Sequence, residues 1–198
     1  MLVVHEFAPY NVVIISDNTY DNGDQLELNC SSEGGPDLVY SWSRVNDFSS
    51  DTVTNTSTLN VSNLVTVDGG DYTCTVTNDA GTSSTTVTVY VAPYNVVIMG
   101  NNTYDNGDQL ELNCLSEGGP DLEYSWSRTN TFSNDTVTNL NTLIISDLAT
   151  VDGGEYTCFV TNDAGTSMNT ITVNVWQGLQ NGSIKTYNCP FDCLSAFQ

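Results

Sequence analysis

The chain has 198 residues and carries 24 Asp plus Glu against only three Lys plus Arg, for a formal net charge of −21. That length suits two domains of about 85 to 100 residues with a short tail. A surface this acidic repels phosphate and lacks the basic stripe that nucleic-acid binding requires, so the composition excludes a nucleic-acid partner and disfavours an anionic membrane surface.

Residues 1–7 precede the repeated part of the chain, and we expect them to be a leader or the end of a missing upstream domain. Met1 to Val4 is apolar, but His5 and Glu6 interrupt it before the apolar core of a signal peptide can form. No stretch approaches the roughly 18 apolar residues of a membrane span. We therefore expect a fragment of a longer protein, with no direct membrane insertion in this chain.

The segment 8–91 returns as 92–175 at an offset of 84 residues, and 64 of the 84 aligned positions are identical. The second copy begins where the first ends, with no Gly/Ser-rich spacer between them. These limits predict two domains of one kind, 8–91 and 92–175, followed by a short irregular tail at 176–198.

Alternation of apolar and polar residues predicts strands throughout each repeat, because successive strand residues point to opposite faces. In the first repeat we expect a strand through 26–30, a turn at 34–37, and strands at 38–42, 59–61, 72–76 and 86–91. No helical period of useful length interrupts them, and Thr and Val enrichment favours strands. The fold class is predicted to be all-β.

Two features of each repeat point to one family. The tryptophan follows the first cysteine by 12 residues, and the second cysteine follows the first cysteine by 44. The segments Asp68–Gly81 and Asp152–Gly165 also share an Asp-x-Gly-x-Tyr-x-Cys pattern and end in Asn-x-Ala-Gly. This resembles the immunoglobulin superfamily, intermediate (I-set) type, over residues 8–175. The resemblance implies two tandem immunoglobulin-like β-sandwiches of Greek-key topology with about seven to eight strands each.

The same resemblance implies structural roles for a set of residues in each repeat. It implies that a disulfide joins the two sheets, that a tryptophan packs against it, and that a tyrosine two residues before the second cysteine forms a tyrosine corner. A zinc site is a poor rival for these cysteines, because structural zinc needs four clustered ligands and the only histidine is His5. The residues are Cys30, Cys74, Trp42 and Tyr72 in the first repeat, and Cys114, Cys158, Trp126 and Tyr156 in the second.

In many members of that family, the residue equivalent to Asp68 pairs with a basic residue at the start of strand D. Here the corresponding segment, Thr52–Thr54, has no Lys or Arg, so we expect Asp68 to cap the turn between strands E and F or to pair with Arg44. Arg44 and its equivalent Arg128 are either ion-paired strand ends or ligand contacts, and the sequence leaves both readings open.

The remaining candidate sites are weaker. Six Asn-x-Ser/Thr sequons are glycosylation candidates, although a chain this rich in Asn, Ser and Thr contains about that many by chance. The acidic turn with Asp17, Asp21 and Asp24 does not fit the EF-hand register, which leaves only weak, irregular calcium binding open. We expect no cofactor and no defined metal site. The sequons lie at Asn29, Asn55, Asn60, Asn101, Asn134 and Asn181.

The tail adds Cys189 and Cys193, whose pairing the sequence leaves open: a small loop, the start of another disulfide-rich module, or a truncation scar, which we favour. Six cysteines, four of them in the sandwich framework, predict an oxidising compartment, either extracellular or the cell surface.

Neither repeat contains a histidine, so no Ser–His or Cys–His nucleophile can be assembled there, and we expect no enzyme. The favoured function is a non-catalytic, extracellular protein-binding module of a cell adhesion or recognition protein, with a homophilic or heterophilic ligand. Alternatives are a structural spacer in a long extracellular-matrix array and, less favoured, an intracellular I-set domain pair.

Overall fold

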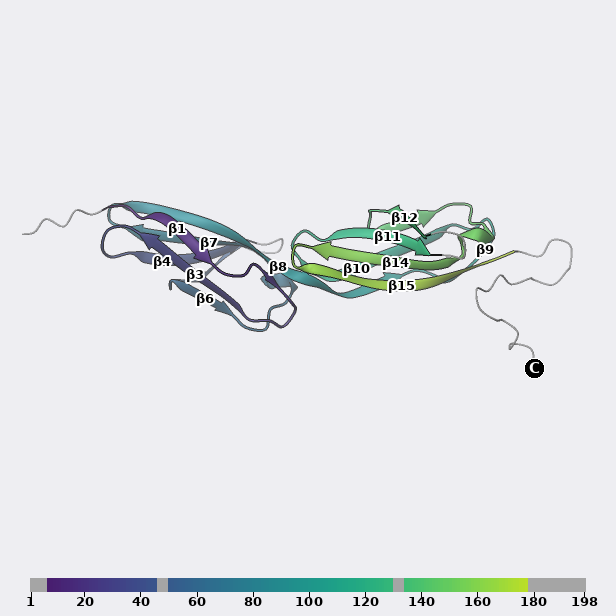
Figure 1. The fold of residues 1–198 in the computed structure, drawn as a ribbon, viewed down its shortest axis with the longest axis horizontal. Coiled ribbons are helices and arrows are strands. Elements are labelled where there is room, and N and C mark those ends of the chain that lie inside the picture. Colours follow the sequence, from purple (N-terminus) through teal and green to yellow (C-terminus); the bar gives the residue numbers. More distant parts are fainter. Residues whose placement is uncertain (1–6, 46–49, 130–133, 178–198) are drawn as a thin grey trace, which may run out of the picture. The chain divides into compact units, whose positions relative to one another are not determined.

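A computed structural model describes residues 7–45, 50–129 and 134–177, apart from the side chains of 50–53 and 134–137. It confirms the all-β fold class, with an immunoglobulin-like sandwich in each repeat (Figure 1). The first repeat contains β1 (Tyr10–Ile15), β2 (Thr19–Tyr20), β3 (Leu26–Glu33), β4 (Val39–Val45), β5 (Ser50–Thr54), β6 (Thr58–Val61), β7 (Gly70–Asn78) and the start of β8 (Gly81–Met99).

The second repeat takes over the end of β8 and repeats the order of elements. It contains β9 (Thr103–Asp105), β10 (Leu110–Gly119), β11 (Glu123–Thr129), β12 (Asn134–Thr138), β13 (Thr142–Ile145), β14 (Gly154–Asn162) and β15 (Gly165–Trp176). A 3₁₀ turn precedes the penultimate strand of each repeat, at Thr66–Asp68 and Thr150–Asp152.

Each sandwich consists of two sheets with the same strand order. In the first repeat β1, β3 and β6 form one sheet, while β5, β4, β7 and β8 follow one another in the other, with β2 parallel to β8. In the second repeat β8, β10 and β13 are neighbours, and β12, β11, β14, β15 and β9 form the opposite sheet. The strand β8 therefore ends the first repeat and begins the second without a break.

The sequence alternation produces the core of the first sandwich. On β3, Leu26 and Leu28 are fully buried while Glu27 between them is exposed, as the two-residue strand period requires. Trp42 on β4 and Tyr72 on β7 are also fully buried. The second sandwich repeats this pattern with Leu110, Leu112, Trp126, Leu143, Tyr156 and Val160.

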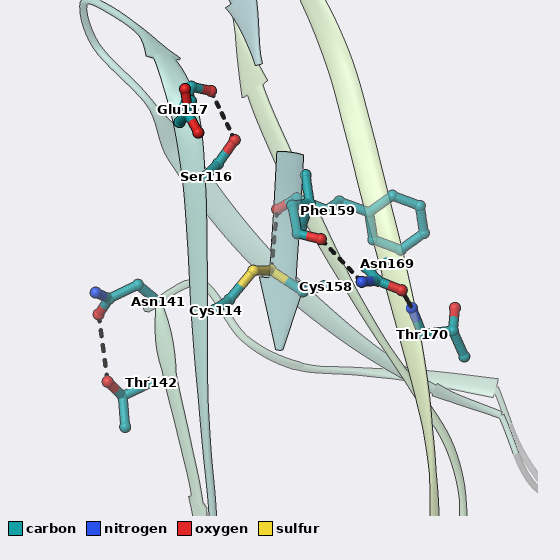
Figure 2. Close-up of a disulfide and its surroundings, with 10 residues drawn as sticks. Cys114, Ser116, Glu117, Asn141, Thr142, Cys158, Phe159, Asn169 and Thr170 are labelled. Carbon is teal, nitrogen blue, oxygen red and sulfur yellow. Dashed lines mark hydrogen bonds between the residues drawn. A yellow bond between two sulfur atoms is a disulfide. The ribbon is translucent and has the colours of Figure 1, made fainter. Parts of the chain in front are cut away.

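A disulfide crosses the core of each sandwich. Cys30 on β3 is bonded to Cys74 on β7, and Cys114 on β10 is bonded to Cys158 on β14, with Cα atoms 6.4 Å apart in both pairs. Figure 2 shows the second of these bridges. Because the bonded strands belong to different sheets, each bridge holds the two sheets of its sandwich together.

The expected strand D takes a different place. A strand D would lie in the sheet of strands A, B and E, yet β5, which contains Thr52–Thr54, pairs antiparallel with β4 in the other sheet, with Arg44 opposite Asp51. Only four residues separate β4 from β5, and so short a connection turns the chain back beside the strand that it has just left. The segment that corresponds to the start of strand D in the family therefore pairs with β4 in this chain.

Removal of one disulfide tests its share of the stability. We expect the double substitution Cys30→Ala with Cys74→Ala to lower the free energy of unfolding of the first repeat by about 4 kcal/mol, because the bridge closes a long loop in the unfolded chain. Denaturant unfolding followed by tryptophan fluorescence measures this loss. Cys114→Ala with Cys158→Ala is the matched variant in the second repeat. An unchanged unfolding midpoint in both variants would refute the prediction.

Candidate binding surfaces and the predicted site residues

The tyrosine corner of the first repeat is built around Asp68, in the turn between β6 and β7. The hydroxyl of Tyr72 donates a hydrogen bond of 2.7 Å to the backbone oxygen of Asp68. One carboxylate oxygen of Asp68 accepts the backbone N–H of Val65 at 3.0 Å. The buried ring of Tyr72 is thereby fixed to the turn by its single polar atom, as a buried tyrosine requires.

Arg44 completes this cluster from β4. Its Nη1 lies 3.1 Å from the second carboxylate oxygen of Asp68 and 3.5 Å from the hydroxyl oxygen of Tyr72. Burial acts to lower the pKa of the Arg44 guanidinium, but the interactions with Tyr72 and Asp68 outweigh it and the pKa is raised. Burial raises the pKa of the Tyr72 hydroxyl, although Arg44 opposes this shift. Both expectations for Asp68, capping and pairing with Arg44, therefore hold at once.

The second repeat contains the same cluster. Arg128 Nη1 lies 2.8 Å from Asp152 Oδ1, the Tyr156 hydroxyl donates to Asp152 O at 2.7 Å, and Ala149 N donates to Asp152 Oδ2 at 2.9 Å. Both arginines are thus held by a carboxylate at the end of a sheet. This geometry favours ion-paired strand ends over ligand contacts for Arg44 and Arg128.

The acidic turn considered for calcium has a local role. Asp24 Oδ2 accepts the backbone N–H of Asp21 at 2.9 Å, and the backbone oxygen of Asp17 accepts the hydroxyl of Tyr20. Within 7–45, 50–129 and 134–177, no three His, Cys, Asp or Glu side chains gather closely enough to hold a metal ion. The Asp24 carboxylate therefore stabilises the turn itself.

The structure places four of the six sequons in different environments. Asn55, Asn60 and Asn101 are exposed, whereas Asn29 is half-buried in β3. The Asn29 side chain donates to Glu27 Oε1 at 2.8 Å and accepts from Thr58 Oγ1 at 2.8 Å. Asn113, its equivalent without a sequon, has the corresponding bonds to Glu111 and Thr142, which indicates a structural role for this position. The side chains of Asn134 and Asn181 lie outside the described residues.

Sequence reasoning missed a group of exposed apolar side chains in the second repeat. We call them the second-repeat apolar face. They lie on β8, β10 and β13 and in the bend before β13, and their exposed fractions run from 48% to 67%. A signal was present in the sequence, since three of the five are polar in the first repeat. The face consists of Val97, Met99, Leu115, Leu140 and Ile144.

The prediction for the tail concerns residues outside the described part of the chain, since Cys189 and Cys193 lie beyond residue 177. The described residues include no helix with the length and apolar character needed to cross a bilayer.

Replacement of the corner tyrosine tests the Asp68 cluster. We expect Tyr72→Phe to lower the free energy of unfolding near neutral pH by about 1 kcal/mol, the typical net value of one hydrogen bond. The raised pKa of Tyr72 means that the folded state holds this proton more tightly than the unfolded chain. Its contribution is therefore present below the unfolded pKa of about 10 and lost as pH rises through the folded pKa.

Tyr72→Phe should accordingly lose less stability between neutral and strongly alkaline pH than the parent protein. Thermal unfolding across this pH range measures the difference. Tyr40→Phe is the matched control, because Tyr40 is a half-buried tyrosine on β4, four residues from Arg44, and is not part of the Asp68 cluster. Parallel stability curves for the parent and Tyr72→Phe would contradict the assignment.

We propose that sugars occupy the exposed sequons and avoid Asn29. In protein secreted from eukaryotic cells, glycopeptide mapping should find glycans on Asn55, Asn60 and Asn101, whose side chains are accessible to the transferase. Asn29 should remain unmodified because both polar atoms of its amide are bonded within the sheet. Equal occupancy of Asn29 and Asn60 would show that this bonding does not protect the site.

Comparison with known proteins agrees with the geometry. A family profile described as an immunoglobulin domain matches residues 11–78 and 95–162. The chain is 32% identical over 152 residues to the human "Cell adhesion molecule DSCAM", covering 71% of this chain and 8% of that protein. It is 29% identical over 156 residues to the mouse "Basement membrane-specific heparan sulfate proteoglycan core protein", covering 77% of this chain and 4% of that protein.

A crystal structure of the four N-terminal immunoglobulin domains of Dscam1 isoform 4.44 is similar in fold, with a TM-score of 0.64 at 20% identity. The match covers 87% of this chain and 46% of that one. The chain thus spans less than a tenth of these two relatives and under half of the solved structure. The two disulfide-bonded sandwiches and the two matched segments show that the chain belongs to the immunoglobulin domain family.

Proposed function

We propose that this chain is a non-catalytic, extracellular protein-binding module of a cell adhesion or recognition protein. The observation that carries this proposal is the second-repeat apolar face, which exposes five apolar side chains on a chain that is otherwise strongly acidic. Exposed apolar groupings rimmed by polar residues are typical of protein interaction sites. Relatives named as cell adhesion molecules support the same role.

The compartment follows from the bridges. Disulfides persist in oxidising surroundings and are rare where cellular thiol systems keep cysteines reduced. Both sandwiches contain one at their centre. We therefore place the protein outside the cell or at its surface, and we propose 8–91 and 92–175 as the limits of its two domains.

A structural spacer in a matrix array is the second candidate. Repetition with 64 of 84 identical positions is typical of arrays in which each unit adds length. Two relatives are far longer than this chain, the heparan sulfate proteoglycan core protein and "Hemicentin-1". A spacer needs no exposed apolar face, so the two candidates differ in whether the chain by itself binds another protein.

Multivalent display distinguishes the two candidates. The chain is secreted from eukaryotic cells behind an added signal peptide, coupled to fluorescent beads, and applied to a panel of adherent cell lines and to matrices deposited by them. Dense coupling raises avidity, so weak contacts become measurable. Beads coupled to an unrelated acidic protein of similar net charge are the control for charge alone.

A binding module should retain beads on at least one cell line or matrix well above the charge control, and protease treatment of that surface should release them. Retention no higher than the control on every surface would reject the binding module and favour the spacer.

A further inference from the structure

The two repeats differ systematically in their sequons. The first repeat contains three, at Asn29, Asn55 and Asn60, and the second repeat retains none of them. The losses arise at three separate places in the sequence: Ser31 becomes Leu115, Thr56-Ser57 becomes Leu140-Asn141, and Asn60 becomes Ile144. Each substitution abolishes one glycosylation signal, since Asn-x-Ser/Thr is required.

Each loss also places an apolar side chain at the surface. Leu115 is 48% exposed, Leu140 is 67% exposed and Ile144 is 54% exposed. A buried apolar replacement would have improved the core, but exposed ones bury little on folding and add nothing comparable to stability. The replacements therefore change the character of the surface and leave the interior of the sandwich as it was.

Strand pairing brings the three substituted positions onto one face. Glu111 is opposite Ile144 and Asn113 is opposite Thr142, so β10 and β13 run side by side. The backbone N–H of Cys114 donates to Asn141 O at 2.8 Å, and continuing this register by one residue brings Leu140 opposite Leu115.

The neighbouring strand extends the same face. In the first repeat, Val13 on β1 is opposite Ser31 on β3. The equivalents of these two residues are Val97 on β8 and Leu115 on β10, and β8 is the neighbour of β10. Val97 and Met99 are exposed on β8. Exposed apolar residues from three strands and one bend thus share one face of the second repeat, with the polar pair Asn113 and Thr142 between Leu115 and Ile144.

The charged side chains along this face are acidic. Glu111 and Glu117 are exposed on β10, on either side of Leu115. The cations of the described residues, Arg44 and Arg128, are both ion-paired, on β4 and β11 of the opposite sheets. The face therefore combines exposed apolar side chains with interspersed carboxylates, and its described residues include no basic side chain.

From this arrangement we propose that the second-repeat apolar face, Val97, Met99, Leu115, Leu140 and Ile144, is the docking surface of the module, and that its partner is a protein surface with apolar side chains bordered by Lys or Arg. The equivalent face of the first repeat is shielded by sugar and does not dock. The inference rests on the proposed function and assigns its binding surface and the chemistry of its ligand.

Charge argues for a basic partner over a second copy of the chain. Two copies meeting through this face would bring the Glu111 and Glu117 carboxylates of both together with no cation between them. Each copy also carries a net charge of −21. A basic rim instead pairs with these carboxylates and is attracted by the acidic surface as a whole.

The sequon at Asn101, which is exposed, lies at the edge of the second-repeat apolar face. Asn101 follows Met99 by two residues and lines a shallow hollow with Glu111 and Asn113. Leu115 and Leu140 lie toward the other end of β10. Sugar on Asn101 would therefore border Met99 and Glu111, the residue opposite Ile144, and leave Leu115 and Leu140 open.

The first part of the test uses a defined probe, a short synthetic peptide in which Leu alternates with Lys. Matched peptides replace Leu with Thr, or Lys with Glu. Titration into the methyl-labelled full chain, followed by NMR, should shift the methyl signals of Leu115, Leu140 and Ile144 and leave those of Val13 and Ile15 in place. The two matched peptides should leave the signals of Leu115, Leu140 and Ile144 unshifted, and added salt should weaken binding of the Leu–Lys peptide.

The second part restores the lost sugar. Ile144→Asn recreates a sequon with Ser146, matching Asn60-Val61-Ser62 of the first repeat. Secreted from eukaryotic cells and shown by mass to be glycosylated, this variant should bind the Lys–Leu peptide about tenfold more weakly or worse. Met168→Ser is the matched control, because Met168 is 64% exposed on β15 in the opposite sheet. Its affinity should be unchanged.

Several results would overturn the proposal: unchanged affinity in the glycosylated Ile144→Asn protein, equal shifts at Val13 and Ile15, equal binding of the Glu–Leu peptide, or self-association of the parent chain that Ile144→Asn abolishes. Retention of Ile144→Asn beads on the cells that hold parent beads would place docking elsewhere while leaving the proposed function intact. Failure of the parent beads on every surface would instead reject the proposed function.

Discussion

The covalent link between the two sheets of each sandwich is the constraint on which the rest of the structure depends. The bridges join β3 to β7 and β10 to β14, and the fully buried Trp42 and Trp126 lie on the strands paired with the second cysteine of each bridge. A domain of this size buries a modest core, so one bridge is a large part of its total stability. The Asp68 and Asp152 clusters add a second tie, because each connects an arginine, a turn and a buried tyrosine at the end of a sheet.

A core held in this way leaves the surface free to diverge. The two repeats share their cysteines, tryptophans, corner tyrosines and aspartates, and their 20 differences include the substitutions that remove the three sequons of the first repeat and place leucine and isoleucine at the surface. A sheet face presented by a disulfide-bonded scaffold is well suited to binding, because its side chains are already ordered and little conformational entropy is lost when a partner docks. The repeat therefore separates the residues that maintain the sandwich from the exposed residues that differ between its two copies.

Alternation was sufficient to predict the all-β class, because it reflects the two faces of each strand. The immunoglobulin sandwich was expected from the family resemblance carried by the Cys, Trp and Cys spacing and the motif around the second cysteine. Asp68 was left between two roles, and the structure shows both, since a carboxylate has two oxygens and each takes one partner. The sheet to which Thr52–Thr54 belongs could not be taken from the family pattern, because the short connection after β4 decides the pairing. The second-repeat apolar face was missed because Leu115, Leu140 and Ile144 are scattered in the sequence, and only the register of β10 with β13 brings them together.

Peptide mapping of the chain secreted from eukaryotic cells, with and without reduction, tests the central claim most directly, since an extracellular, disulfide-bonded recognition module must form its bridges on passage through the secretory pathway. The account predicts secreted protein in which Cys30 is linked to Cys74 and Cys114 to Cys158. Free thiols at these four positions, or protein retained in the cell in a misfolded form, would contradict the account and favour an intracellular domain pair.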